Sequence, residues 1–101
     1  MKIETSSYGK IATTSIELQT GFEVEALTMK RYSGNLVTTF TLFKKVSENC
    51  KQTCVNFKSS SVDHGKQRIT EKNLTKFHNE ALERLGDFKE HFEKEIINFN
   101  Q

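Results

Sequence analysis

The chain has 101 residues, enough for one domain built around one modest hydrophobic core. Hydrophobic residues make up 35% of it, and the formal net charge is only +2 with both signs interspersed, which argues against nucleic-acid binding through bulk positive charge. No apolar run approaches the roughly 20 residues that cross a membrane, and the first residues contain no apolar signal segment. We therefore expect a cytoplasmic protein whose Cys50 and Cys54 are free thiols.

Residues 1–60 carry the alternating pattern of β-strands and are rich in Thr and other β-branched residues. Turn signals separate the alternating segments at Gly21, at Gly34 with Asn35, and in the polar stretch 47–52. The segments predicted as strands are 2–5, 10–18, 22–32, 36–46 and 53–58. This spacing predicts an antiparallel meander of four or five strands.

Two registers compete for the hairpin that contains Gly34. If both predicted hairpin loops have three residues, Gly21 and Asn35 take the left-handed backbone conformation and Ala26 faces Leu42. A two-residue turn at Gly34 and Asn35 would instead exchange the two faces of one strand. We favour the first register, because both hairpins then share one apolar face. That face consists mainly of Ile16, Leu18, Phe22, Val24, Ala26, Tyr32, Leu36, Phe40, Leu42 and Val46.

Residues 70–100 repeat apolar side chains with the period of an α-helix. The stripe consists of Leu74, Phe77, His78, Ala81, Leu82, Leu85, Phe88, Phe92, Ile96 and Phe99. Gly86 could divide the segment, but the apolar phase continues across it, which favours one long helix bent at Gly86. Thr70 is the expected N-cap residue, because its hydroxyl can accept a hydrogen bond from the first turn.

The apolar stripe of this helix is the natural cover for the apolar face of the sheet. Residues 61–69 join the two and are predicted as a polar loop. We therefore predict an α+β fold in a single domain, residues 1–101. Its parts are an antiparallel meander in 1–60, the loop in 61–69, and one long C-terminal amphipathic helix in 70–100, packed on one face.

The combination closest to a metal site is Cys50 and Cys54 with Asp63 and His64. Zinc needs four such ligands, but this spacing matches no standard zinc pattern, so we expect no metal and no cofactor. His78 lies within the apolar stripe, where we expect it to pack at the core edge and bond a backbone carbonyl. The sequence contains no phosphate-binding glycine loop and no nucleophile motif, so we expect no catalytic residues and no enzyme.

The second face of the predicted sheet carries apolar residues that the helix does not cover. An exposed apolar cluster with a polar rim is typical of an association surface. We therefore expect this face to bind another protein, and a homodimer with a second copy of the chain is one such complex. The expected partner-binding residues are Leu27, Met29, Arg31, Val37, Phe43 and Lys45.

Nucleic acid is the alternative partner. Cations at the strand ends could contact phosphates, and Tyr32 and Phe43 could stack on bases. The cations concerned are Lys30, Arg31, Lys44, Lys45, Lys51, Lys58, Lys66 and Arg68. In size and type, though in no motif, the chain is similar to phage or mobile-element inhibitors of host complexes, such as anti-CRISPR proteins.

Overall fold

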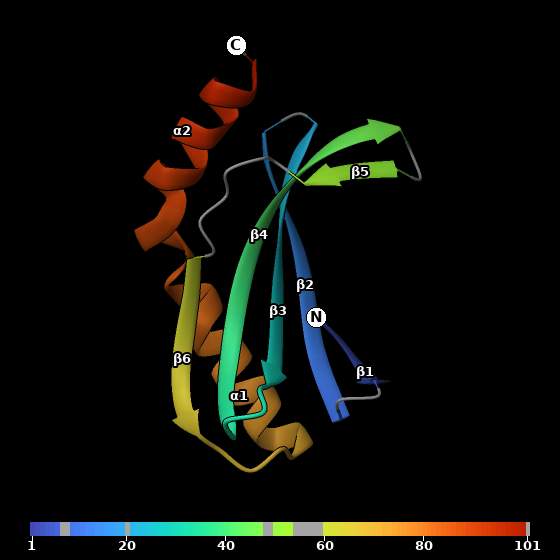
Figure 1. Cartoon of the computed structure of the whole chain (residues 1–101), viewed down its shortest axis with the longest axis vertical. Helices are drawn as coiled ribbons and strands as arrows, with labels where there is room; N and C mark the ends of the chain where they lie inside the picture. The colour runs from blue at the N-terminus through green and yellow to red at the C-terminus, as the bar shows by residue number, and fades with distance from the viewer. Residues whose placement is uncertain (7–8, 20, 48–49, 54–59, 101) are drawn as a thin grey trace.

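The computed structural model describes residues 1–6, 9–19, 21–47, 50–53 and 60–100, and it has the predicted α+β class. The strands are β1 (Lys2–Ser6), β2 (Gly9–Gln19), β3 (Phe22–Lys30), β4 (Asn35–Ser47), β5 (Cys50–Thr53) and β6 (Ser60–Lys66). The helical elements are α1 (Glu71–Glu83), the 3₁₀ helix η1 (Leu85–Phe88) and α2 (Lys89–Asn100). In Figure 1, α1 lies behind the lower half of the sheet and α2 continues upward beside it.

The sheet is an antiparallel meander in the order β1-β2-β3-β4-β5, with β6 also paired to β4. β4 is 13 residues long, and its two halves have different neighbours on the same side. The register pairs Phe43 with Thr53 of β5, and Phe40 with Ser60 of β6. Figure 1 shows β5 beside the upper end of β4 and β6 beside its lower part. The strand is therefore long enough to serve as the common edge for two short strands.

Strand β6 corrects the predicted loop at 61–69. Ser60–Lys66 forms seven residues of strand that pair with the first half of β4. The segment has a single β-branched residue, Val62, so its composition gave no strand signal. The strand forms because β5 leaves this half of β4 unpaired, and buried backbone groups need partners. The predicted strand at 53–58 lies, apart from Thr53, outside the described residues.

The register of the first hairpin follows the prediction, since Ile16 pairs with Val24. The second hairpin is shifted by two positions, so that Ala26 pairs with Phe40 rather than with Leu42. A shift of two keeps every side chain on its predicted face, whereas a shift of one would exchange the faces. The predicted division of the sheet into two faces is therefore correct although the predicted pairing is not.

The shift arises from a longer loop between β3 and β4. The Arg31 N–H donates to the Asn35 carbonyl at 2.9 Å, and the Gly34 N–H donates to the Arg31 carbonyl at 2.9 Å. Gly34, with φ of 89°, takes the left-handed conformation that the three-residue loop predicts for Asn35. Two residues predicted to face the helix consequently do not: Tyr32 lies in the loop and is 98% exposed, and Val46 extends beyond β3 and is 63% exposed.

The helical segment is divided rather than continuous. Thr70 is the N-cap as predicted, because its hydroxyl accepts a hydrogen bond from the Asn73 N–H at 3.1 Å. The α-helix ends at Glu83, and the 3₁₀ helix η1, which contains Gly86, leads into α2. Gly86 has the low helix propensity that permits such a break. The apolar stripe nevertheless stays on one side, because Phe92 and Ile96 of α2 join the same core as Ala81 of α1.

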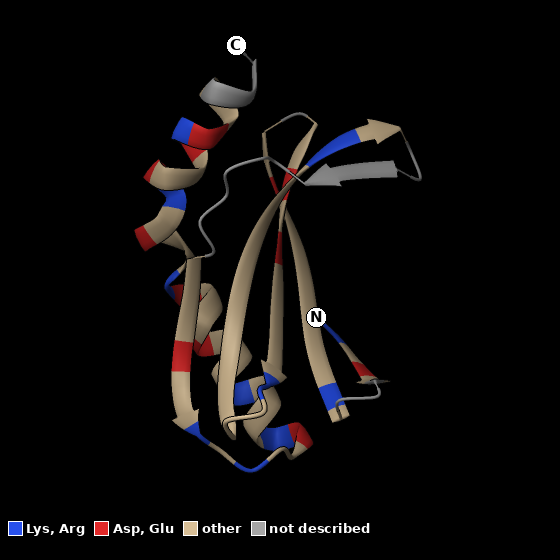
Figure 2. Cartoon of the chain, viewed as in Figure 1, with Lys and Arg blue, Asp and Glu red and all other residues tan. Residues whose placement is uncertain are grey.

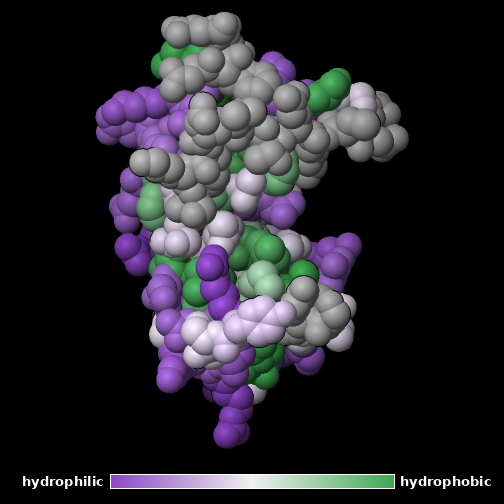
Figure 3. Space-filling view, viewed as in Figure 1, coloured by the Kyte–Doolittle hydropathy of each residue, from purple (hydrophilic) through white to green (hydrophobic). Residues whose placement is uncertain are grey.

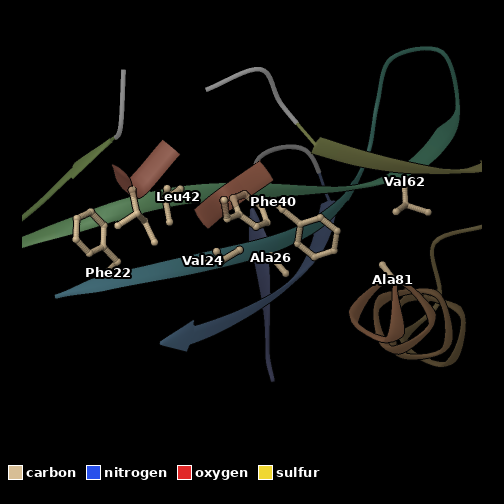
Figure 4. Close-up of a cluster of buried hydrophobic side chains, with 9 residues drawn as sticks. Phe22, Val24, Ala26, Phe40, Leu42, Val62 and Ala81 are labelled. Atoms are coloured by element: carbon tan, nitrogen blue, oxygen red, sulfur yellow. The ribbon is translucent and has the colours of Figure 1, made fainter. Parts of the chain in front are cut away.

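Two apolar clusters form the core between the sheet and the helices. The larger cluster consists of Phe22, Val24, Ala26, Phe40, Leu42, Val62, Ala81, Phe92 and Ile96 (Figure 4). The smaller cluster consists of Ala12, Leu36 and Leu74, with Ile3 and Phe77 packed against it. Along β3, β4 and α1, the buried polar residues Thr28, Thr38 and His78 lie between the members of these clusters.

Candidate functional site

The face of the sheet opposite the helices, called here the open face, carries four of the predicted partner-binding residues. Met29 is paired with Val37 across β3 and β4, and Leu27, two residues before Met29, lies on the same face opposite Thr39. Phe43 lies farther along β4, opposite Glu23. These side chains therefore share one surface, but Phe43 lies four residues along β4 from Thr39, the partner of Leu27, which is two repeats of the pleat.

The two predicted basic residues lie at opposite ends of this surface. Arg31 is exposed in the loop after β3, while Lys45 is exposed near the end of β4. Sequence reasoning missed Ile11, which faces Glu4 of β1 and which the alternation of β2 places on the same side. Its signal was present in that alternation.

The apolar centre of the open face is shallow. Leu27, Met29 and Phe43 are half-buried, and Val37 is only 5% exposed. Val37 is more enclosed than expected because β4 is an inner strand, with Met29 on one side of it and Asp63 on the other. In Figure 3, where this face is turned toward the viewer, hydrophobic surface lies near the middle, and most of the surface at the lower end is hydrophilic.

Carboxylates form a band on the open face. Glu17 of β2 is paired directly with Glu23 of β3, and Glu25, two residues farther along β3, lies on the same face. Like charges that face each other across strands repel. Lys45 offsets part of this repulsion, since its Nζ lies 3.6 Å from Glu23 Oε2. The red segments of β2 and β3 in Figure 2 mark this acidic band, which adjoins the apolar centre.

The covered face contains a chain of hydrogen bonds between side chains. His78 of α1 is fully buried, with Nε2 at 2.7 Å from Thr14 Oγ1 and Nδ1 at 2.7 Å from Thr28 Oγ1. Thr28 Oγ1 lies 2.6 Å from Thr38 Oγ1, which lies 2.9 Å from His64 Nε2. The prediction that His78 bonds a backbone carbonyl at the core edge is therefore wrong. The threonines occupy alternating positions within apolar strands, and this signal was overlooked.

Both histidines of this network favour the neutral form. Burial lowers the pKa of His78 to about 4, helped by the positive charge of the N-terminal amine and by His64. Burial also lowers the pKa of His64, against the opposing effect of Glu80 and Asp63. A neutral imidazole has one donor nitrogen and one acceptor nitrogen, so His78 donates to one threonine and accepts from the other. The network thus links α1 to four strands, β2, β3, β4 and β6, without any buried charge.

Of the residues weighed as a metal site and not expected to form one, Asp63 and His64 bond other groups. Cys54 belongs to the residues that the structure does not describe. Asp63 accepts hydrogen bonds from Asn35 Nδ2 at 3.0 Å and from the Gly65 N–H at 2.8 Å, while His64 bonds Thr38. Within the described ranges, no group of three or more His, Cys, Asp and Glu residues is arranged to hold a metal ion.

Three of the predicted cations converge at the lower end of the molecule. Lys30, Lys66 and Arg68 line an open pocket of about 360 Å³, together with Gly34 and Gln67. Figure 2 shows the blue segments that gather at this end. Lys44 and Lys45 lie at the opposite end of β4, so the predicted basic strand ends do not form one surface.

The chain matches no family model, no curated protein and no solved structure. In the part of the chain that the structure describes, none of the helices has the length and apolar character needed to span a bilayer.

Proposed function

We propose that this protein is a small non-catalytic module that binds another protein through the open face of its sheet. The observation that carries the proposal is the combination of surfaces on that face. An apolar centre around Leu27 and Met29 adjoins a band of carboxylates, and neither helix covers them. Apolar area removed from water supplies the association energy, and charges at the rim select the partner.

The partner fitted by this surface has an apolar contact patch with lysines and arginines beside it. Glu17 and Glu25 offer carboxylates that such cations can approach, and Glu17 is exposed. Electrostatic complementarity of this kind raises the association rate and excludes partners of the wrong charge. A basic protein surface is therefore a better fit than a second copy of the chain, because in a symmetric dimer through this face two acidic bands would repel each other.

The contacts of the histidines support a non-catalytic role. His78 has both ring nitrogens bonded to threonines and no exposed surface. His64 is held against Thr38 and the ring of Phe77, whose centroid lies 5.1 Å from its own. A general base must reach the proton that it abstracts, and these two side chains are occupied in the fold.

A module that acts by binding can inhibit or regulate the protein whose surface it covers. Basic surfaces are common on proteins that handle nucleic acids, since they neutralise phosphates. An acidic open face suits an inhibitor of such a complex. That the chain is a phage-encoded inhibitor of a host complex, like the anti-CRISPR proteins, stays a prediction based on the size and type of the chain.

The test compares capture of a partner by the parent chain and by open-face variants. Leu27→Lys places a charge in the apolar centre, and Phe43→Lys places one at its edge. The matched control is Ile97→Lys, because Ile97 is an apolar residue on α2 that is 58% exposed and lies away from the open face. The protein recovered from extract of the native host is purified, and its dissociation constant is measured with each variant by calorimetry.

We expect Leu27→Lys to weaken binding at least about tenfold, or about 1.4 kcal/mol, while Ile97→Lys leaves it unchanged. Circular dichroism checks that each variant is folded. Equal binding by all variants would exclude the open face as the interface.

Nucleic-acid binding is the second candidate, favoured by the convergence of Lys30, Lys66 and Arg68 at one pocket. Treatment of the extract with nuclease separates the two candidates. If nuclease removes every partner, the nucleic-acid function replaces the protein-binding one. Salt gives an independent criterion, because phosphate contacts weaken steeply with added salt and an apolar protein interface responds weakly.

A further inference from the structure

The pocket at the lower end of the molecule is built from three separate segments. Lys30 ends β3, Gly34 lies in the loop that follows, and the segment from Lys66 to Arg68 leads from β6 toward α1. A Cβ added at Gly34 would lie 4.0 Å from Lys66 Cγ, so the loop and the end of β6 are in close contact. The pocket therefore depends on tertiary packing rather than on one stretch of sequence.

Hydrogen bonds fix the backbone beneath the cations. Gln67 Nε2 donates to the His64 carbonyl at 3.0 Å. The Arg68 carbonyl accepts from Asn73 Nδ2 at 3.0 Å and from the Thr70 N–H at 3.1 Å, which ties it to the start of α1. A charged side chain on a fixed backbone loses less entropy when it binds a ligand. The site is thus partly organised before any ligand arrives.

The charges in this pocket have one sign. Its lining contains three cations, a glycine and a glutamine, with no carboxylate. Across the described ranges, no ion pair engages Lys30, Lys66 or Arg68. The acidic residue in the adjoining strand, Asp63, is turned to other partners. The Gly65 N–H and the Asn35 amide bond its carboxylate and lower its pKa.

We propose that this pocket binds a phosphate group of single-stranded nucleic acid. An arginine guanidinium offers a planar donor fork that matches two phosphate oxygens, and the two lysines add point charges. Gln67 adds a neutral amide to the lining. The proposal deepens the second candidate function, nucleic-acid binding, by naming the phosphate contact and the type of strand. It uses residues outside the open face, so variants of that face that abolish protein binding do not test it.

Tyr32 favours a polynucleotide over a free phosphate ion. It lies in the same loop as Gly34, two residues from Lys30, and its side chain is 98% exposed. An exposed aromatic ring beside a basic groove is the arrangement that stacks on bases of single strands. Phosphate contact in the pocket and base stacking on Tyr32 can then act on neighbouring parts of one strand.

The test measures binding of a fluorescently labelled single-stranded oligonucleotide by anisotropy at low salt. The double variant Lys66→Gln/Arg68→Gln removes two charges from the pocket. The matched control Lys89→Gln/Lys94→Gln removes two charges from exposed positions on α2. We expect the pocket variant to bind at least about tenfold more weakly, with less than about a twofold change in the control.

Salt dependence tests how many phosphates are contacted. Three contacts predict a slope of log affinity against log salt of about −2, because each single-strand contact contributes about −0.7. Removal of two cations should reduce the slope to about −0.7. Equal affinity of the pocket variant and the parent, or an unchanged slope, overturns the proposal.

Competitors identify the source of the phosphate. Polyglutamate displaces the oligonucleotide only if the pocket attracts any anion, and equal competition by it overturns the phosphate assignment. Inorganic phosphate and ATP are tested at the same total phosphate concentration as the oligonucleotide. If they compete equally well, the assignment to nucleic acid is overturned and the ligand is a free phosphate compound. We expect Tyr32→Ala to weaken the oligonucleotide several-fold and to leave phosphate binding unchanged.

Discussion

The two faces of the sheet are made from the same strands and handle polar residues in opposite ways. On the covered face, the buried polar side chains are hydroxyls and a neutral imidazole that bond one another, as Thr28 and His78 do. On the open face the polar side chains that reach water are charged, as Glu17 and Glu25 are. Burial penalises charge unless it is paired, whereas a face in contact with water tolerates it. The contrast shows that the helices, rather than the strands, decide which polar chemistry each face can carry.

The two faces are also expected to have different roles, the covered face in stability of the fold and the open face in binding of a partner. The covered face and the helices packed on it bury their largest side chains fully, among them Phe40 of β4 and Phe92 of α2. The open face keeps Leu27 and Met29 half-buried, so it retains area that another surface could remove from water. We therefore expect substitutions on the covered face to alter the free energy of unfolding, and those on the open face to alter binding.

The largest expected effect comes from shortening aromatic side chains on β4. Phe40→Ala should lower the free energy of unfolding by about 3–5 kcal/mol, because Phe40 is fully buried in the larger cluster and its loss leaves a cavity. Phe43→Ala, three residues along the strand on the open face, should cost less than half as much. Urea unfolding measures both. Similar losses for the two variants would show that the open face is packed as tightly as the covered one.

A smaller effect is expected from pH, because the covered face excludes charge. The pKa of His78 is about 4 when folded and near its ordinary value of 6.5 when unfolded. Between these values the unfolded chain binds a proton that the folded chain does not. Stability is therefore complete above about pH 6.5 and falls as pH decreases toward 4, by up to about 3 kcal/mol.

Urea unfolding of the parent and of His78→Gln across this pH range isolates the contribution of His78. The Gly65 N–H lowers the pKa of Asp63, so the contribution of this carboxylate to the free energy of unfolding is lost at low pH in both proteins. We expect the variant to show a flatter dependence on pH than the parent. Parallel curves would mean that His78 is not held neutral by the fold.

The smallest pair of effects comes from two adjacent threonines. Thr38→Val removes a hydroxyl that bonds both Thr28 and His64, so it should cost about 1–3 kcal/mol. Thr39→Val, on the open face, should change stability by less than about 0.5 kcal/mol. Thermal unfolding measures both. Since the two substitutions are chemically identical, an equal cost would contradict the assignment of the network to the covered face.

The features that depend on local pattern can be predicted from the amino-acid sequence. Alternation assigned the faces of β2, β3 and β4, because a side chain points up or down according to its position in the strand. Helical periodicity located the apolar stripe of α1 and α2, and Thr70 was identified as a cap from its hydroxyl. These features follow from the chain's own geometry over a few residues, so no distant contact was needed to predict them.

The remaining features depend on residues far apart in the chain, so they follow from the folded structure alone. The bond between Thr14 and His78 joins positions separated by 64 residues. Strand β6 forms where β4 offers an unpaired edge, and Lys30 meets Lys66 only once that pairing exists. A two-residue shift in register leaves the apolar pattern unchanged, so pattern could not reveal it. Such contacts form only when the whole chain is folded, because each one requires a long loop to close. The entropy lost in closing these loops is offset only by all the contacts of the folded chain acting together.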